Sequence, residues 1–202
     1  FSATLDPSSN DYVSALALQA DGRLLAGGRF AQVNGGVERR LLARFEADGS
    51  VDAGFRAAAY AALDPWQTGV KLIALQADGK MVVVRDSYSV APNGSWAGMD
   101  TMLRLLGDGG TDTGFPQRWF WWTADALAPG AHGEILVGGS FGGIDTGTSA
   151  HPHLAWLSPG GADISDSVKL PVPDDAVLAI VAEPDGWVIG GAFSHLDGAA
   201  RT

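Results

Sequence analysis

Hydrophobic and polar positions follow a pattern that returns four times along the chain. Each copy starts with a short apolar run, then a turn such as Asp21-Gly22, then a second apolar run. In three copies this second run ends in a double glycine such as Gly27-Gly28. Because glycine readily adopts the positive φ of a tight turn, Asp-Gly between two apolar runs predicts a β-hairpin. The corresponding turns of the later copies are Asp78-Gly79, Gly133 and Asp185-Gly186.

Two further strands are expected in the first copy, over residues 41–45 and 50–55, on either side of Asp48-Gly49. The second copy keeps this order, the third loses it near its end, and the fourth shows only the first hairpin. No stretch has a sustained helical period. Four short strands repeated about every 50 residues predict an all-β fold, a β-propeller of four-stranded antiparallel blades. A β-sandwich with coincidental turns and a β-solenoid are the alternatives.

The domain organisation predicted from the repeat is a single array over residues 1–202. Its blades cover roughly residues 1–55, 56–115 and 116–166, with a partial blade at 167–202. About three and two-thirds blades are therefore present. Since a propeller closes by pairing its first and last blades, we expect an incomplete ring or a segment of a longer array.

The repeated string can be written V-x-A-L-A-x-Q-x-D-G-K/R-x-L-x-G-G-x-F, then N-G, then L-A-R-F/L-x-x-D-G-S-x-D-x-x-F. This string resembles the delta-60 repeat, a bacterial β-propeller domain of unknown function. The resemblance covers residues 13–55, 70–84 with 102–115, 124–141, and in part 177–198. It implies a large secreted or surface-attached bacterial protein, and so an extracellular or cell-surface location. It implies no catalytic residues.

Composition narrows the classes of partner. The net charge of −10 disfavours nucleic acids and anionic membrane surfaces, because both are themselves negatively charged. Apolar runs such as residues 177–182 are too short for membrane insertion. The chain contains no cysteine, which excludes disulfides and thiolate metal sites.

Candidate chemistry lies where the copies differ from one another. Two long loops are expected at residues 86–100 and 142–153, and connections between copies carry several tryptophans. Loops of this kind often carry function, and flat indole rings stack on sugars or anchor proteins. The candidate ligand-binding residues are Trp66, Tyr88, Trp96, Trp119, Trp121, Trp122, His151 and His153. Alternatively, the run at residues 119–122 leads into a buried strand or plugs a junction between blades.

No cofactor is expected. His151 and His153 with Asp145 have a weak metal-ligand spacing. The acidic turn at residues 108–112 offers oxygens to calcium, but it coincides with a repeated hairpin turn that needs Asp and Gly for its shape. The sequence Gly138-Gly139-Ser140-Phe141-Gly142 has the form of a nucleophile elbow, yet it aligns with double-glycine strings that lack serine in the first and fourth copies.

The leading interpretation is a non-catalytic, secreted or cell-surface β-propeller used for binding, adhesion or assembly, with a protein or carbohydrate as its ligand. One alternative is a glycan-active enzyme in which two carboxylates converge on one face. The nearby carboxylates are Asp86, Asp100, Asp125 and Asp145. The other is a structural subunit whose open edges join further blades of a parent chain or a neighbouring subunit.

Overall fold

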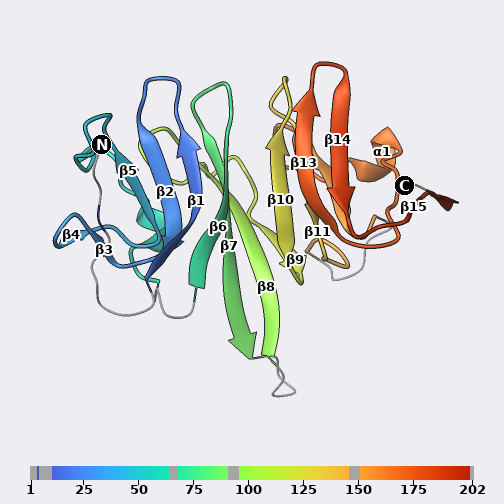
Figure 1. Cartoon of the computed structure of the whole chain (residues 1–202), viewed down its shortest axis with the longest axis horizontal. Coiled ribbons are helices and arrows are strands. Elements are labelled where there is room, and N and C mark those ends of the chain that lie inside the picture. The colour runs from blue at the N-terminus through green and yellow to red at the C-terminus, as the bar shows by residue number, and fades with distance from the viewer. Residues whose placement is uncertain (1–3, 5–10, 64–67, 91–95, 146–150, 201–202) are drawn as a thin grey trace. The chain divides into compact units, whose positions relative to one another are not determined.

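The computed structural model describes residues 4, 11–63, 68–90, 96–145 and 151–200, without the side chains of residues 87–90, 96 and 97. Its regular structure is almost entirely antiparallel β-strand (Figure 1). None of the helices in this part of the chain is long and apolar enough to span a membrane. The elements are β1 (Tyr12–Leu18), β2 (Leu24–Arg29), β3 (Gln32–Val33), β4 (Val37–Glu38), β5 (Leu42–Phe45), the 3-10 turn η1 (Ala58–Tyr60), β6 (Thr68–Leu75), β7 (Met81–Val90), β8 (Trp96–Leu105), β9 (Arg118–Trp121), β10 (Ala124–Pro129), β11 (Ile135–Gly139), β12 (Leu154–Leu157), α1 (Ser165–Val168), β13 (Val177–Glu183), β14 (Gly186–Gly191), β15 (His195–Leu196) and β16 (Ala199–Ala200).

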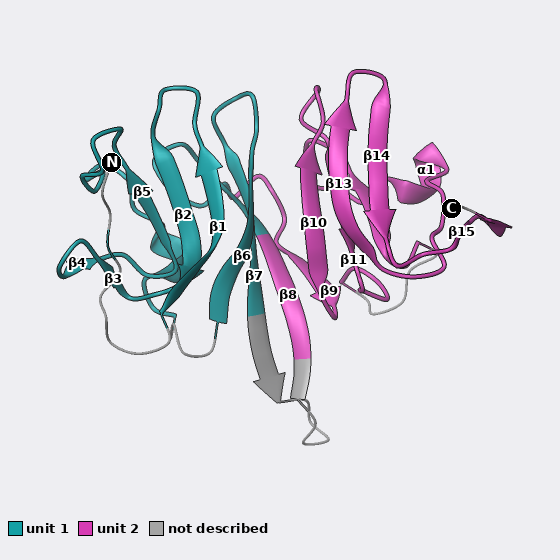
Figure 2. Cartoon of the chain, in the orientation of Figure 1, with its two compact units in different colours: residues 1–88, 103–112 teal, residues 89–102, 113–202 magenta. Residues whose placement is uncertain are grey.

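The chain folds into two compact units, residues 1–88 with 103–112 and residues 89–102 with 113–202 (Figure 2). The larger sheets have the strand orders β1-β2-β5, β6-β7-β8-β9, β10-β11-β12 and β13-β14. Each sheet begins at one of the four predicted hairpins. The sheets therefore follow the copies of the sequence pattern.

A β-bulge occurs at the same place in every one of these hairpins. The register shifts directly after the residues Val13, Val70, Ala124 and Val177. In three copies the second glycine of the pair lies opposite the bulge, where the neighbouring backbone leaves no room for a side chain. A Cβ there would lie only 2.0–2.1 Å from a carbonyl oxygen of the first strand or of the residue before it, at the positions Gly28, Gly139 and Gly191. Glycine is thus required for the close approach of two backbones.

The first glycine of the pair has a different role, because it receives a side chain from the next copy. A Cβ on Gly27 would lie 2.3 Å from a methyl carbon of Val70 in β6. A Cβ on Gly138 would lie 2.6 Å from a methyl carbon of Val177 in β13. Both valines are fully buried. Within each unit, one sheet therefore packs on the next by a valine placed over a glycine.

A buried ion pair lies near the end of both the first and the second copy. Arg44 Nε donates to Asp52 Oδ2 over 2.7 Å, and its guanidinium lies 4.6 Å from the Phe55 ring centre. Arg104 Nε donates to Asp112 Oδ2 over 2.9 Å in the same way. The arginine and the aspartate belong to the repeated string, which explains why both recur together.

The third copy replaces both partners of this pair. Trp156 and Ile164 stand at the two positions, and the backbone bond from the Ile164 N–H to the Trp156 carbonyl remains, at 2.8 Å. The indole of Trp156 packs edge-on against Trp187, with ring centres 6.1 Å apart. Joint replacement is physically reasonable, because removing one partner would leave an uncompensated buried charge whereas removing both does not.

Two local expectations are wrong. The strand expected over residues 50–55 is a single bridge between Phe45 and Val51. The loop expected over residues 86–100 is largely strand, since β7 continues to Val90 and β8 begins at Trp96. Val84 and Arg85 stand in place of the double glycine there, and the ladder continues past them, with Gly69 paired to Asp86.

Gly27→Val and Gly138→Val are each expected to destabilise the protein by about 1–3 kcal/mol, because the new methyl groups would overlap a filled space. Gly190→Val is the matched control. Gly190 has the same place in the fourth copy, and no atom of the described residues lies within 4 Å of its would-be Cβ. Urea unfolding of the three variants measures the difference, and equal losses at all three positions would contradict the role assigned to Gly27 and Gly138.

Asp52→Asn is expected to lower the free energy of unfolding at neutral pH by about 3 kcal/mol, because it removes the counter-charge of a buried arginine. Burial alone would raise the pKa of Asp52, but hydrogen bonds from Arg44 and the Gly54 backbone hold it below its usual value. The pair's contribution is therefore complete above the unfolded pKa of about 3.9 and is lost as the pH falls through the folded pKa.

Denaturant unfolding of wild type and Asp52→Asn across the acid range should show the difference in stability narrowing as the pH falls. Glu46→Gln is the control, because the 3.2 Å pair between Glu46 and Arg23 is partly exposed and contributes about 0–1 kcal/mol. A difference between wild type and Asp52→Asn that stays constant down to the lowest pH would show that the Asp52 charge is not the source of the stability.

Candidate functional site

Strand β9 and Trp122, the residue directly after it, carry the most exposed group of aromatic side chains in the described part of the chain. It pairs with β8, with Trp121 opposite Met99 and Trp119 opposite Thr101. Phe120 points inward and packs on Phe141, with ring centres 5.1 Å apart. The side chains of Trp119, Trp121 and Trp122 are 42%, 41% and 71% exposed. We call these three residues the aromatic strip.

Asp145 holds the strip in place. Its backbone N–H donates to the Trp119 carbonyl over 2.7 Å, and its carboxylate accepts the Trp119 N–H at 3.1 Å. Its carbonyl accepts the Trp121 indole N–H at 3.4 Å, and its carboxylate forms an ion pair with Arg118. Asp145 thus fixes the backbone of Trp119 and one indole N–H, while the three indoles remain exposed.

The same clamp occurs in two other copies. Asn34 exchanges the equivalent two hydrogen bonds with the backbone of Thr4, and Asp197 does so with Val172. The three clamping residues share a left-handed backbone, with φ of 48°, 58° and 50° at Asn34, Asp145 and Asp197. The clamp therefore belongs to the repeat, and the tryptophans do not. At the positions of Trp119, Trp121 and Trp122, the fourth copy has Val172, Asp174 and Asp175.

Trp122 combines exposure with backbone strain. Its φ of 88° is in the region that disfavours residues with a Cβ, at a cost on the order of 1–2 kcal/mol. At 71% exposure, the indole recovers little of that cost by burial in this chain. Strain of this kind at an exposed side chain is typical of functional positions.

The two histidines predicted as ligand-binding residues contact other parts of the chain. Trp66 and the side chains of Tyr88 and Trp96 lie outside the described residues. His151 Nε2 lies 2.9 Å from Asp166 Oδ1, so its ring is engaged by α1. His153 has a φ of 68° and matches Leu41 of the first copy, whose φ is 63°, and both donate their backbone N–H to the phenylalanine that follows the double-glycine segment. His153 therefore has a repeated backbone role.

Neither metal nor serine chemistry finds support among the described residues. No group of three or more His, Asp or Glu side chains there could hold a metal ion. Ser140 Oγ lies 3.3 Å from Asp125 Oδ2, and no helix follows its strand as a nucleophile elbow would require. Asp100 accepts the Ala124 N–H at 2.8 Å, and Asp86 accepts that of Gly69. These carboxylates are used to fix backbone.

The sequence did not point to one polar cluster, at Asp174, Ser194 and His195. Ser194 Oγ and Asp174 Oδ2 each lie 2.9 Å from the same ring nitrogen of His195, Nδ1. The His195 backbone N–H is the main donor that holds the pKa of Asp174 below its usual range. A catalytic triad needs serine and aspartate on opposite ring nitrogens, so this cluster caps a turn and does not relay a proton.

Comparison with known families agrees with the repeated architecture. Residues 19–55 and 76–115 match the model of a family described as a domain of unknown function (DUF5122) beta-propeller. A search of curated proteins gives no match. The two matched segments are the first two copies of the sequence pattern. Together with the antiparallel all-β structure, they confirm the predicted fold class.

Proposed function

We propose, from the premise that residues 19–55 and 76–115 belong to the β-propeller family also called the delta-60 repeat, that this chain is a non-catalytic binding module with the aromatic strip as its ligand surface. The observation that carries the proposal is the exposure of three indoles on a backbone that the repeat itself builds. Nothing in the repeat requires tryptophan there, because other copies form the same clamp with Thr4 and Val172.

A carbohydrate is the ligand class that suits this surface best. Neighbouring indoles offer flat apolar faces that stack on sugar rings, and the carboxylate of Asp145 beside them is an acceptor for hydroxyl groups. A protein partner anchored by the same indoles is the alternative. The extracellular or cell-surface location that accompanies this function rests on the family resemblance alone.

A second candidate function, assembly, is favoured by one valine and one glycine that lack the packing partner their counterparts have among the described residues. Val13 has the position of Val70 and Val177, directly before the bulge, but it is 40% exposed. Gly190 has the position of Gly27 and Gly138, but no described residue occupies the space above it. One end of the repeat series therefore presents a valine, and the other presents the glycine that would receive it.

The side chains around these two positions extend the match. Leu16 and Leu18 of β1 are exposed, whereas Ile73 and Leu75 at the same positions of β6 pack against the core of unit 1. Val188 of β14 is exposed, whereas its counterparts Leu25 and Leu136 are buried. We propose that the β1 face of one chain packs on the β14 face of a second copy, as consecutive sheets pack within each unit.

The aromatic strip is tested on a glycan array, where we expect the wild type to give hits. Trp119→Ala and Trp121→Ala should each weaken such a hit about tenfold or more, as expected of exposed aromatic anchors. Val181→Ala, which removes an exposed apolar side chain from β13, should leave it unchanged. An array without hits, or a hit retained by the variant lacking all three indoles, would overturn the proposal.

The variant Trp122→Gly distinguishes a role of Trp122 in ligand binding from a role in stability. Glycine accepts the φ of 88° without strain, so the variant should unfold at the same or a higher urea concentration while ligand binding falls. A loss of stability together with binding would instead assign Trp122 a structural role.

Assembly is tested by sedimentation velocity over a range of protein concentrations. The wild type should associate, whereas Leu16→Asp and Gly190→Val should each remain monomeric, because each variant blocks one of the two faces. A mixture of the two variants should form one-to-one dimers through the two faces left intact, which is the signature of a head-to-tail interface. Val168→Asp, at an exposed apolar residue of α1, is the control that should still associate. A wild type that is monomeric at every concentration, or a mixture without dimers, would exclude this interface.

A further inference from the structure

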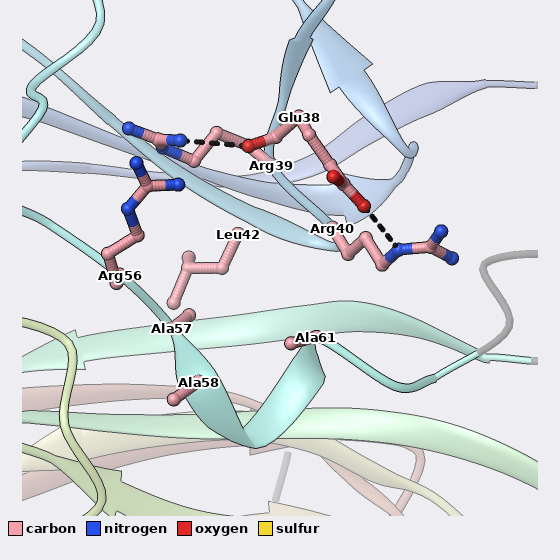
Figure 3. Close-up of a pocket in the computed structure, with 8 residues that line it drawn as sticks. All are labelled: Glu38, Arg39, Arg40, Leu42, Arg56, Ala57, Ala58 and Ala61. Carbon is pink, nitrogen blue, oxygen red and sulfur yellow. Dashed lines mark hydrogen bonds and ion pairs between the residues drawn. The ribbon is translucent and has the colours of Figure 1, made fainter.

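A small cavity in unit 1 gathers positive charge in a strongly acidic chain. It has a volume of about 170 Å³ and is lined by three arginines, Arg39, Arg40 and Arg56, together with Glu38, Leu42 and alanines of the η1 turn (Figure 3). Arg39 and Arg40 follow β4, and Arg56 lies just before η1. The chain has a net charge of −10, so this concentration of cations runs against its overall balance.

The guanidinium of Arg39 is buried without a hydrogen bond to a carboxylate among the described residues. Arg39 is 5% exposed, and its Nη atoms donate to the backbone carbonyls of Glu38 and Asp52 over 2.8 and 3.1 Å. Among the described residues, its Nε has no partner. Burial, followed by repulsion from Arg56, lowers the pKa of Arg39, and the Asp52 charge offsets this only in part.

The neighbouring carboxylates accept hydrogen bonds from other arginines. Glu38 accepts from Arg40 Nε over 3.2 Å, and Figure 3 shows this pair directed away from the guanidinium groups of Arg39 and Arg56. Asp52 accepts from Arg44 over 2.7 Å. In the described part of the chain, no acceptor contacts the guanidinium of Arg56. Two arginine heads thus share one end of the cavity, and burying such a charge is costly unless it is paired.

We propose that this cavity binds a compact oxyanion between Arg39 and Arg56. Guanidinium groups present planar donor forks that match the oxygens of carboxylate, sulfate and phosphate groups. The volume of about 170 Å³ is below the range of about 300–1,000 Å³ typical of sites for whole small molecules. The site therefore takes a single anionic group, either free or carried on a larger ligand. This proposal is independent of the aromatic strip.

Titration of the chain with acetate, sulfate and phosphate, against chloride at equal ionic strength, tests the site. Isothermal titration calorimetry and the thermal midpoint should both show a saturable effect for at least one oxyanion. Acetate alone would assign a carboxylate, and the other two alone a tetrahedral group. Arg56→Gln should weaken that binding about tenfold or more, because it removes charge-assisted hydrogen bonds while changing only an exposed residue.

Lys169→Gln is the matched control, because it removes one exposed positive charge that does not line the cavity and should leave binding unchanged. Sulfate and phosphate also stabilise proteins generally by exclusion from the surface, an effect that does not saturate and does not depend on Arg56. A response that is linear in concentration, or equal in wild type and Arg56→Gln, would overturn the proposal. So would the absence of any response beyond chloride.

Discussion

The close approach of a valine to a glycine is the constraint on which the rest of this structure depends. Val70 over Gly27, and Val177 over Gly138, bring one sheet against the next with no room for a further methyl group. The bulge that follows each valine bends the first strand, and the second glycine lets the two backbones of the hairpin approach at that bend. Sequence, strand geometry and sheet packing are thus set by one short segment.

Because that segment is repeated, the same backbone conformation and hydrogen bonds occur in several copies with different side chains. The clamp at Asn34, Asp145 and Asp197 keeps its hydrogen bonds and left-handed φ whether it holds Thr4, Trp119 or Val172. The bond between third strand and closing turn likewise persists when an ion pair gives way to Trp156 and Ile164. Because backbone and turn residues make these hydrogen bonds, the other side chains can differ between copies. Binding properties can arise at those variable side chains.

The features that were predictable from the sequence are those with local causes. Asp-Gly turns, double glycines and short apolar runs located the hairpins, since turn geometry depends on adjacent residues. The extension of β7 and β8 was not predictable from turn signals, because Val84 and Arg85 replace the glycine pair and the ladder continues past them. The alternation along β9 was missed because the run at residues 119–122 is apolar throughout, so pairing with β8, and not composition, decides which rings are buried.

Arg39 and Arg56 illustrate a further limit. They are 17 positions apart in the sequence, and the path of the chain through β5 to the η1 turn brings them together. The only signal in the sequence was the occurrence of three arginines, at residues 39, 40 and 56. Two energetic costs in this structure lie at such departures. A left-handed, exposed Trp122 and a buried Arg39 that donates to no carboxylate among the described residues are unfavourable within the chain alone, whereas the ion pairs of the repeat are satisfied. In a protein whose repeated residues are occupied by packing, an uncompensated cost is a physical reason to look for a ligand there.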